Sequence, residues 1–165
     1  CCLDLETANK NRIGVVFGVG IGGIKTFEEE VTYYGKHPEN GPKFNPFFIP
    51  KMIADIASGH ISIHFGFHGP NYTTTSACAS STNALADAFN LIRLGKADMI
   101  VSGGAESAIC ACGVGGFNAM KALSTRNDDP EHASRTTPMR FLLAVSRSRP
   151  QSFTPCMAAI SASWV

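Results

Sequence analysis

The chain has 165 residues, a formal net charge of +1 and 44% hydrophobic residues. This length and composition suit one ordinary globular domain with a real core. The charge is nearly balanced and the basic residues form no patch, which argues against nucleic-acid binding. No apolar run reaches the roughly 20 residues that span a bilayer. The chain opens at Cys1-Cys2 without a basic-then-apolar signal region, so we expect a cytoplasmic protein that binds no membrane.

The first predicted strand is Arg12–Gly18, a short apolar run that ends at glycine. The glycine-rich segment Gly18–Gly23 follows it and raises the alternative of a nucleotide-binding loop. That loop would need G-x-G-x-x-G with a suitably placed acidic residue, or G-K-[ST], and neither is present. We therefore expect these glycines to let backbone segments pass closely.

Two helices are predicted next, Thr26–Tyr34 with Thr26 as its N-cap, and Lys51–His64. The three glutamates 28–30 are predicted to form a solvated face. The histidines 60, 64 and 68 have a spacing that resembles a metal site on a helix. Gly66 should end the helix before the third histidine, so these side chains are predicted to be structural.

The segment Asn71–Ser81 (NYTTTSACASS) is the most informative part of the chain. Asn71–Thr75 reads as a strand because threonine and tyrosine suit a pleated surface. A helical pattern starts at Ala79, and Gly95 is its predicted C′ residue. Its predicted apolar face comprises Leu85, Ala88, Phe89 and Ile92. Cys78 is thereby predicted to lie at a strand-to-helix turn.

A helix N-terminus favours an anion, and the thiolate is the nucleophilic form of cysteine. The small neighbours of Cys78 would let a substrate carbonyl approach the sulfur, and its own N–H could serve as an oxyanion donor. From composition alone, an inert buried cysteine remains the alternative. The other five cysteines are irregularly spaced, and Cys110 and Cys112 form C-x-C rather than a common zinc spacing. We expect neither a metal site nor a disulfide framework.

Beyond the helix, Asp98–Ser102 is predicted to be a second buried strand, and Gly113–Leu123 to be a helix. Glu106 stands in a G-G-A-E turn, where a carboxylate could act as a general base; we interpret it as structural.

Several motifs together resemble the β-ketoacyl-[acyl-carrier-protein] synthases, especially type II condensing enzymes. They are FNPFFIPKMIADIASGH, GHISIHFGFHGPNYTTTSACASSTNAL, DMIVSGGAES and GVGGFNAMKALSTRNDDPEHASR. The resemblance implies a thiolase-like fold, of which residues 1–135 would be roughly the N-terminal βαβ half of a layered α/β/α arrangement. It also implies that Cys78, in the motif S/T-A-C-x-S, accepts the acyl group.

In enzymes of this family the acylated cysteine is attacked by a carbanion from decarboxylated malonyl carrier protein, which elongates a fatty acid chain. The resemblance implies that Ile21 limits the acyl chain, that Phe48 reaches the pocket of a partner subunit in a homodimer, and that Phe117 lines the pocket. It places Lys43 near the surface that docks the acyl carrier protein. It implies no cofactor beyond the pantetheine arm of that carrier.

The resemblance ends near Arg135. No Asp, Glu or Lys follows Glu131, and we hypothesise that the tail 136–165 is out of frame or otherwise foreign to the fold. The two histidine motifs that stabilise the enolate in this family have no counterpart here. We therefore expect a partial chain that does not catalyse condensation by itself.

Three alternatives remain. A polyketide ketosynthase would share these motifs, whereas a chain-length factor lacks the nucleophile, so Cys78 counts against it. A non-catalytic binding domain with the same fold would keep its ligand or carrier-protein binding after Cys78→Ala. A nucleotide-binding domain that uses Gly18–Gly23 would bind dinucleotides in a titration.

Overall fold

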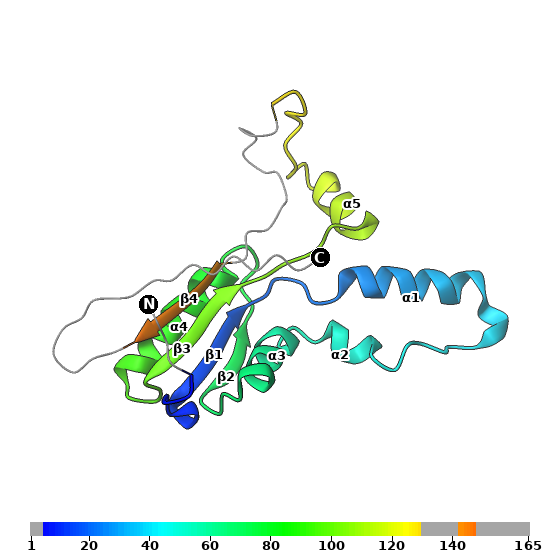
Figure 1. The fold of residues 1–165 in the computed structure, drawn as a ribbon. Coiled ribbons are helices and arrows are strands. Elements are labelled where there is room, and N and C mark those ends of the chain that lie inside the picture. The colour runs from blue at the N-terminus through cyan, green and yellow to red at the C-terminus, as the bar shows by residue number, and fades with distance from the viewer. Residues whose placement is uncertain (1–4, 130–141, 148–165) are drawn as a thin grey trace. The chain divides into compact units, whose positions relative to one another are not determined.

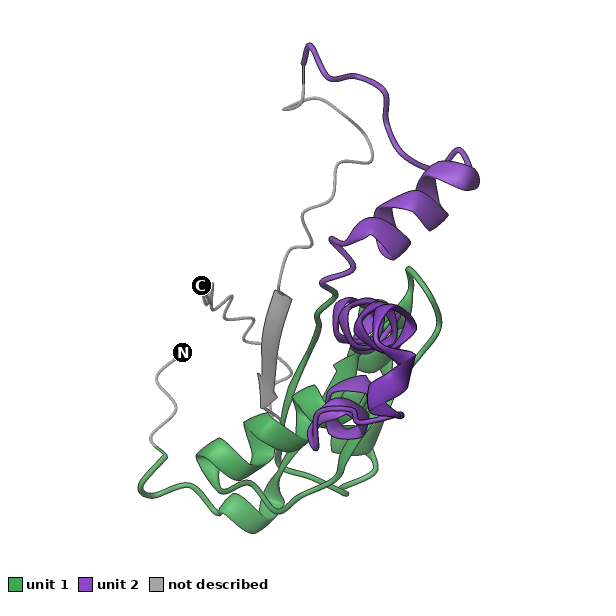
Figure 2. Ribbon diagram, turned by 90° about the vertical axis from the view of Figure 1, so that its right-hand side faces the viewer, with its two compact units in different colours: residues 1–20, 54–106, 140–165 green, residues 21–53, 107–139 purple. Residues whose placement is uncertain are grey.

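The fold is known from a computed structural model that describes residues 5–129 and 142–147. The chain divides into two compact units, shown in different colours in Figure 2. The first unit combines residues 1–20, 54–106 and 140–165, and the second combines residues 21–53 and 107–139. No helix in the described ranges is long and apolar enough to cross a membrane.

The first unit is built on a sheet of strand order β2-β1-β3-β4 (Figure 1). Its strands are β1 (Ile13–Gly18), β2 (Asn71–Thr74), β3 (Met99–Gly104) and β4 (Leu142–Arg147). β1 pairs in parallel with both β2 and β3, while β4 runs antiparallel to β3. A short 3-10 helix, Lys10–Arg12, precedes β1. The three strands predicted from the sequence are confirmed, and their parallel pairing confirms the α/β class.

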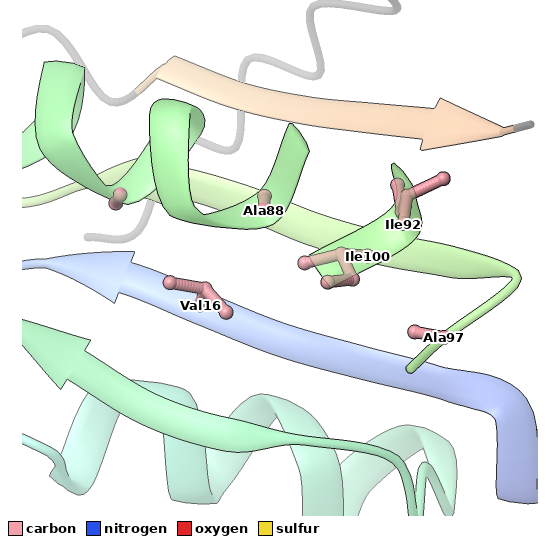
Figure 3. Packing of buried hydrophobic residues seen from close by; sticks show 6 residues of the cluster. Val16, Ala88, Ile92, Ala97 and Ile100 are labelled. Atoms are coloured by element: carbon pink, nitrogen blue, oxygen red, sulfur yellow. The ribbon is translucent and has the colours of Figure 1, made fainter. Parts of the chain in front are cut away.

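Two helices cover the two faces of this sheet. α4 (Ser80–Arg93) packs on Val16 and Ile100, and Figure 3 shows part of this cluster. On the other face, Ile61 of α3 (Ile56–Phe65) packs against a cluster that contains Val15 and Val101. Successive residues of a strand point to opposite faces, so β1 and β3 are buried on both sides, as their continuous apolar runs indicate.

The predicted apolar face of α4 is only partly correct. Ala88 and Ile92 are buried as expected, together with Ala84 at 0% exposure, but Phe89 is 40% exposed. The guanidinium of Arg93 lies 5.7 Å from the centre of the Phe89 ring. The face that contacts the sheet therefore consists mainly of small residues spaced four apart, which lets the helix backbone approach the strands closely.

Ser102 on β3 is 2% exposed, and its hydroxyl has no hydrogen-bond partner within the described part of the chain. Removing a buried hydroxyl that lacks a partner removes a desolvation penalty. We expect Ser102→Ala to raise the free energy of unfolding by about 1 kcal/mol in urea titrations. Ser62→Ala is the matched control, because the buried Ser62 hydroxyl donates to the Phe67 carbonyl at 2.8 Å and its loss should destabilise the chain. A shift of both variants in the same direction would contradict this account.

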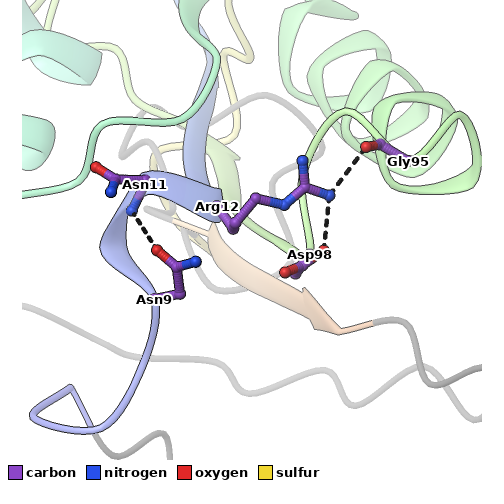
Figure 4. A network of polar contacts seen from close by, with 5 residues as sticks. All are labelled: Asn9, Asn11, Arg12, Gly95 and Asp98. Carbon is purple, nitrogen blue, oxygen red and sulfur yellow. Dashed lines mark hydrogen bonds and ion pairs between the residues drawn. The ribbon is translucent and has the colours of Figure 1, made fainter.

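An exposed polar network ties the start of β1 to the turn after α4 (Figure 4). The Arg12 guanidinium donates to the Asp98 carboxylate at 2.8 Å and to the Gly95 carbonyl at 2.9 Å. Gly95 has a φ of +67° directly after the helix, as the C′ prediction requires. The hydrogen bond from Arg12 lowers the pKa of Asp98.

A carboxyl group whose pKa is lowered by folding contributes stability above its unfolded pKa, and this contribution is lost as pH falls through the folded value. We expect the stability difference between the natural chain and Asp98→Asn to shrink as the pH falls below about 4. Urea midpoints measured at a series of pH values test this. A difference that does not depend on pH would rule out the ion pair as its source.

The second unit contains α1 (Ile24–Lys36), a 3-10 helix (Pro38–Asn40), α2 (Phe48–Met52) and α5 (Ala111–Ala119). The prediction of Thr26 as the N-cap of the first helix is wrong. The N-cap is Gly23, whose φ is +59° and whose carbonyl accepts from the Phe27 N–H at 2.9 Å. A side chain on Gly23 would meet the carbonyl of Lys51, so close backbone approach together with positive φ sets this helix start.

The prediction that all three glutamates of α1 form a solvated face is also wrong. Only Glu29 is exposed; the Glu28 carboxylate accepts from the Cys112 N–H, and Glu30 accepts from the Asn45 N–H at 3.1 Å. These contacts join α1 to the start of α5 and to the loop before α2. Contacts of this kind leave no periodic signal in the sequence.

The single helix predicted over Lys51–His64 is two helices, α2 and α3. Ile53 has extended dihedral angles (φ −70°, ψ 126°), and the division between the two units falls directly after it. Gly66 ends α3 in the left-handed conformation, so His68 lies outside the helix as predicted. The helix predicted over Gly113–Leu123 corresponds to α5 (Ala111–Ala119), which both begins and ends earlier in the chain.

β4 lies within the tail 136–165, whose other residues fall outside the described ranges. Every residue except proline can both donate and accept the main-chain hydrogen bonds of a sheet. The pairing of β4 with β3 therefore does not test whether this segment is foreign to the fold. The hypothesis that the tail is foreign to the fold stays a prediction.

Candidate functional site

Cys78 lies in the short turn that joins β2 to α4, two residues before the helix begins at Ser80. Its side chain is exposed and its sulfur is free. The residue before it, Ala77, has a φ of +50°, which is uncommon for a residue with a Cβ. This sharp turn presents the thiol at the carboxyl end of a parallel strand. The alternative of a sealed, inert cysteine does not fit this exposure.

The Ser80 hydroxyl holds the backbone on both sides of Cys78. It accepts a hydrogen bond from the Ser76 N–H at 2.9 Å and donates to the Ala77 carbonyl at 2.6 Å. Ser80 is only 4% exposed, so water cannot readily replace these contacts. The left-handed geometry of Ala77 is therefore maintained by a buried hydroxyl at the first position of α4.

Two further side-chain contacts support the turn. Asn83, one turn into α4, donates from Nδ2 to the Ser76 hydroxyl at 2.7 Å. Thr74, the last residue of β2, donates from Oγ1 to the Ser80 carbonyl at 3.2 Å. The strand end and the helix start are thus joined directly, and Cys78 is carried between them.

Glycines at the ends of β1 and β3 allow α4 to begin where it does. A Cβ on Gly18 would overlap the main chain of Ser80 and Ser81, and a Cβ on Gly104 would overlap the Ser81 side chain. The sequence-based expectation that the glycines after β1 permit close backbone approach is confirmed at Gly18. The main chain at the start of α4 therefore lies directly against Gly18, and only the small Ser81 side chain lies between the helix and Gly104.

This geometry gives Cys78 two features that a nucleophile needs. The Cys78 N–H belongs to the same residue as the sulfur, so it lies near the oxyanion that would form on an attacked carbonyl. The sulfur of Cys78 is also exposed, so a carbonyl group can approach it. The arrangement suits attack of sulfur on a carbonyl carbon.

The three predicted pocket residues all lie in the second unit. Ile21, just before α1, is 44% exposed, and Phe117 of α5 is 37% exposed. Phe48, at the start of α2, stacks on Phe44 and on Phe27, with ring centres 5.0 Å and 6.4 Å away. Their predicted roles in an acyl pocket stay predictions.

The other residues considered from the sequence do not form a second site. His60, His64 and His68 are exposed, and no group of three or more metal-ligating side chains in the described ranges is arranged to hold an ion. Glu106 lies half-buried after β3, and its carboxylate would contact a Cβ placed on Gly20. Lys43 is exposed in the loop before α2.

The accessible cysteines should differ in reactivity. The pKa of Cys112 is raised, chiefly by a hydrogen bond to Glu28, so less of it is thiolate at neutral pH. We expect iodoacetamide to label Cys78 several times faster than Cys112. Trypsin separates the two in peptides 52–93 and 97–121, which mass spectrometry can follow over time. Equal labelling rates would argue against an activated thiol at position 78.

Comparison with known proteins bears on this geometry. The family model described as "Beta-ketoacyl synthase, N-terminal domain" matches residues 3–138. The 3-oxoacyl-[acyl-carrier-protein] synthase 2 of Synechocystis is 46% identical over 134 residues, which are 81% of this chain and 32% of that protein. The chain therefore spans about a third of the length of this curated relative.

Solved structures agree on the fold. A β-ketoacyl synthase from Burkholderia phymatum is similar with a TM-score of 0.61 and 28% identity, over 82% of this chain and 31% of that one. A type II polyketide ketosynthase complex with its acyl-carrier protein gives a TM-score of 0.66 at 21% identity, over 74% of this chain and 35% of that one. The predicted thiolase-like α/β fold is confirmed.

Proposed function

Since the chain belongs to the family of the β-ketoacyl synthase N-terminal domain, we propose that it carries the acyl-accepting cysteine of a condensing enzyme that elongates fatty acids. The observation that carries this proposal is the exposed Cys78 in the β2–α4 turn, at the start of a helix that rests on Gly18 and Gly104. A curated relative with 46% identity is named as such a synthase, which favours the fatty acid reaction.

The first step is a thioester exchange. The Cys78 thiolate attacks the carbonyl carbon of an acyl group carried on the pantetheine arm of acyl carrier protein, and the carrier thiolate leaves. The Cys78 N–H would stabilise the oxyanion of the tetrahedral intermediate. The acyl group then waits on sulfur until a carbanion, formed by decarboxylation of malonyl carrier protein, attacks it. Covalent catalysis thus divides one difficult step into two easier ones.

The proposal includes the predicted roles of three pocket residues and two partners. Ile21 would limit the length of the acyl chain, Phe117 would line its pocket, and Phe48 would reach the acyl pocket of a partner subunit. The partners would be acyl carrier protein, bound near Lys43, and a second copy of the protein. The solved ketosynthase complex contains an acyl-carrier protein, but its 21% identity supports the fold alone. No cofactor beyond the carrier's pantetheine is proposed, and we expect the reaction to take place in the cytoplasm.

The test uses the protein encoded by the complete coding sequence, incubated with radiolabelled acyl carrier protein thioester. We expect hydroxylamine-sensitive label in tryptic peptide 52–93, which contains Cys78 and no other cysteine. Cys78→Ala should abolish this label. Label that persists in this variant, or a protein that takes up none while it still binds the carrier protein, would favour a non-catalytic binding domain.

A further inference from the structure

The first turn of α5 carries a pair of thiols that the proposed condensation does not use. Cys110 is the N-cap of the helix, and Cys112 is its second residue. Cys112 is exposed and Cys110 is half-buried. Both lie in the second compact unit, together with α1.

One carboxylate brings the two thiols together. Glu28 of α1 accepts a hydrogen bond from the Cys112 N–H, and the thiols of Cys112 and Cys110 both lie near enough to this carboxylate to lower its pKa. Two side chains that share one small acceptor point to the same side of the backbone. This differs from the interior of an α-helix, where side chains two residues apart do not face each other; here Cys110 is the N-cap and has extended dihedral angles.

The spacing along the chain suits a covalent link. Successive Cα atoms are about 3.8 Å apart, so residues two apart cannot be separated by more than about 7 Å. Disulfides usually join Cα atoms that are roughly 4.4–6.8 Å apart. A disulfide across one intervening residue closes a small, strained ring, and strained disulfides are more readily reduced than structural ones.

We propose that Cys110 and Cys112 form a reversible dithiol–disulfide pair, oxidised by small-molecule disulfides of the glutathione type. The thiolate of Cys110 attacks one sulfur of the small disulfide, and one small thiolate leaves. The thiolate of Cys112 then attacks the Cys110 sulfur of the mixed disulfide and expels the second small thiol. The protein loses two electrons and two protons, and the small disulfide gains them as two thiols.

Glu28 controls this pair through charge. Its carboxylate raises the pKa of Cys112, and its own pKa is lowered, chiefly by the Cys112 N–H. A protonated Cys112 reacts slowly, so the second step should be faster when the negative charge is removed. Disulfide formation takes both S–H donors away from Glu28 and weakens the tie between α1 and α5. A metal site is the less suitable interpretation, because no group of ligands for an ion is found in the described ranges.

The test incubates the natural chain in a glutathione redox buffer at pH 7, quenches with acid, alkylates the remaining thiols and digests with trypsin. Peptide 97–121 contains Cys110 and Cys112 and no other cysteine. We expect this peptide to become lighter by two hydrogen atoms and to resist alkylation, and dithiothreitol should reverse both changes. A peptide that stays reduced, or that only accumulates glutathione adducts, while Cys78 in peptide 52–93 reacts would overturn the proposal.

Two variants follow the steps separately. Cys112→Ser should stop at the mixed disulfide on Cys110, and an unreacted Cys110 in this variant would contradict the proposed order of attack. Glu28→Gln keeps an oxygen acceptor but removes the charge, and should speed disulfide formation by about threefold or more. An unchanged or slower rate would rule out control by Glu28. None of these measurements depends on condensation, so their outcome is independent of the proposed acyl transfer.

Discussion

Gly18→Ala should destabilise the chain by about 3 kcal/mol, the upper end of what overpacking usually costs. The added Cβ would overlap main-chain atoms of Ser80 and Ser81. Backbone atoms cannot rotate away as a side chain does, so α4 must lift from the sheet or β1 must shift. Either movement also displaces the turn that carries Cys78. Urea unfolding followed by circular dichroism measures the loss of stability, and iodoacetamide labelling of Cys78 reports the movement of the turn.

Gly59→Ala is the matched control in the same unit. Gly59 lies within α3, and a Cβ there would meet nothing within 4 Å. Because alanine favours a helix over glycine, this variant should gain about 0.5–1 kcal/mol. If both variants lowered the free energy of unfolding equally, the loss would be a general effect of replacing a flexible glycine. The close approach of α4 to β1 would then not explain the result.

The sequence predicted the first unit well because its signals are local. β1 and β3 are buried on both faces, so their apolar residues are continuous, and each predicted strand agrees with the structure within two residues at either end. The turn at Cys78 follows from the change between a threonine-rich strand and a helical period. The position of the change from strand to helix can therefore be predicted from the sequence without tertiary information.

The orientation of α4 was harder to predict because periodicity favours large apolar residues. Leu85 and Phe89 share a face with Ala88, and hydrophobicity alone selects them for the core. The helix instead turns Ser80, Ala84 and Ala88 to the sheet. Its first turn lies against Gly18 and Gly104, and no large side chain fits so near the strands. Close packing overrides hydrophobicity here.

The residues that hold the turn at Cys78 could not be predicted, for a related reason. Ser80 was interpreted only as a small neighbour of Cys78, although its hydroxyl bridges the backbone on both sides of that cysteine. Asn83 donates to the Ser76 hydroxyl, a contact that no pattern in the sequence indicates. The only signal in the sequence is a serine at the first helical position, which is typical of many helices without a catalytic turn.

Ser80→Ala should lower the free energy of unfolding by about 2 kcal/mol, because it removes the acceptor of the Ser76 N–H and the 2.6 Å hydrogen bond to the Ala77 carbonyl, which then keeps only the Ser80 N–H at 3.2 Å. Without this hydroxyl, the positive φ at Ala77 is offset only by the remaining contacts, which include the Asn83 bond to the Ser76 hydroxyl and the Ser80 N–H bond to the Ala77 carbonyl. The turn should relax and Cys78 should lose its fixed position. We expect slower acylation of Cys78 in the complete protein, in addition to an earlier urea midpoint.

Thr82→Ala separates this effect from a general weakening of the helix start. Thr82 lies in the same first turn of α4 but is exposed, so its replacement should change stability by no more than about 0.5 kcal/mol. The acylation rate at Cys78 should also be preserved in this control. If Ser80→Ala lost stability but acylated Cys78 at the natural rate, the hydroxyl would be structural only. The distinction matters because a thiol is reactive wherever it is exposed, whereas a nucleophile must be held at one angle to its oxyanion donor.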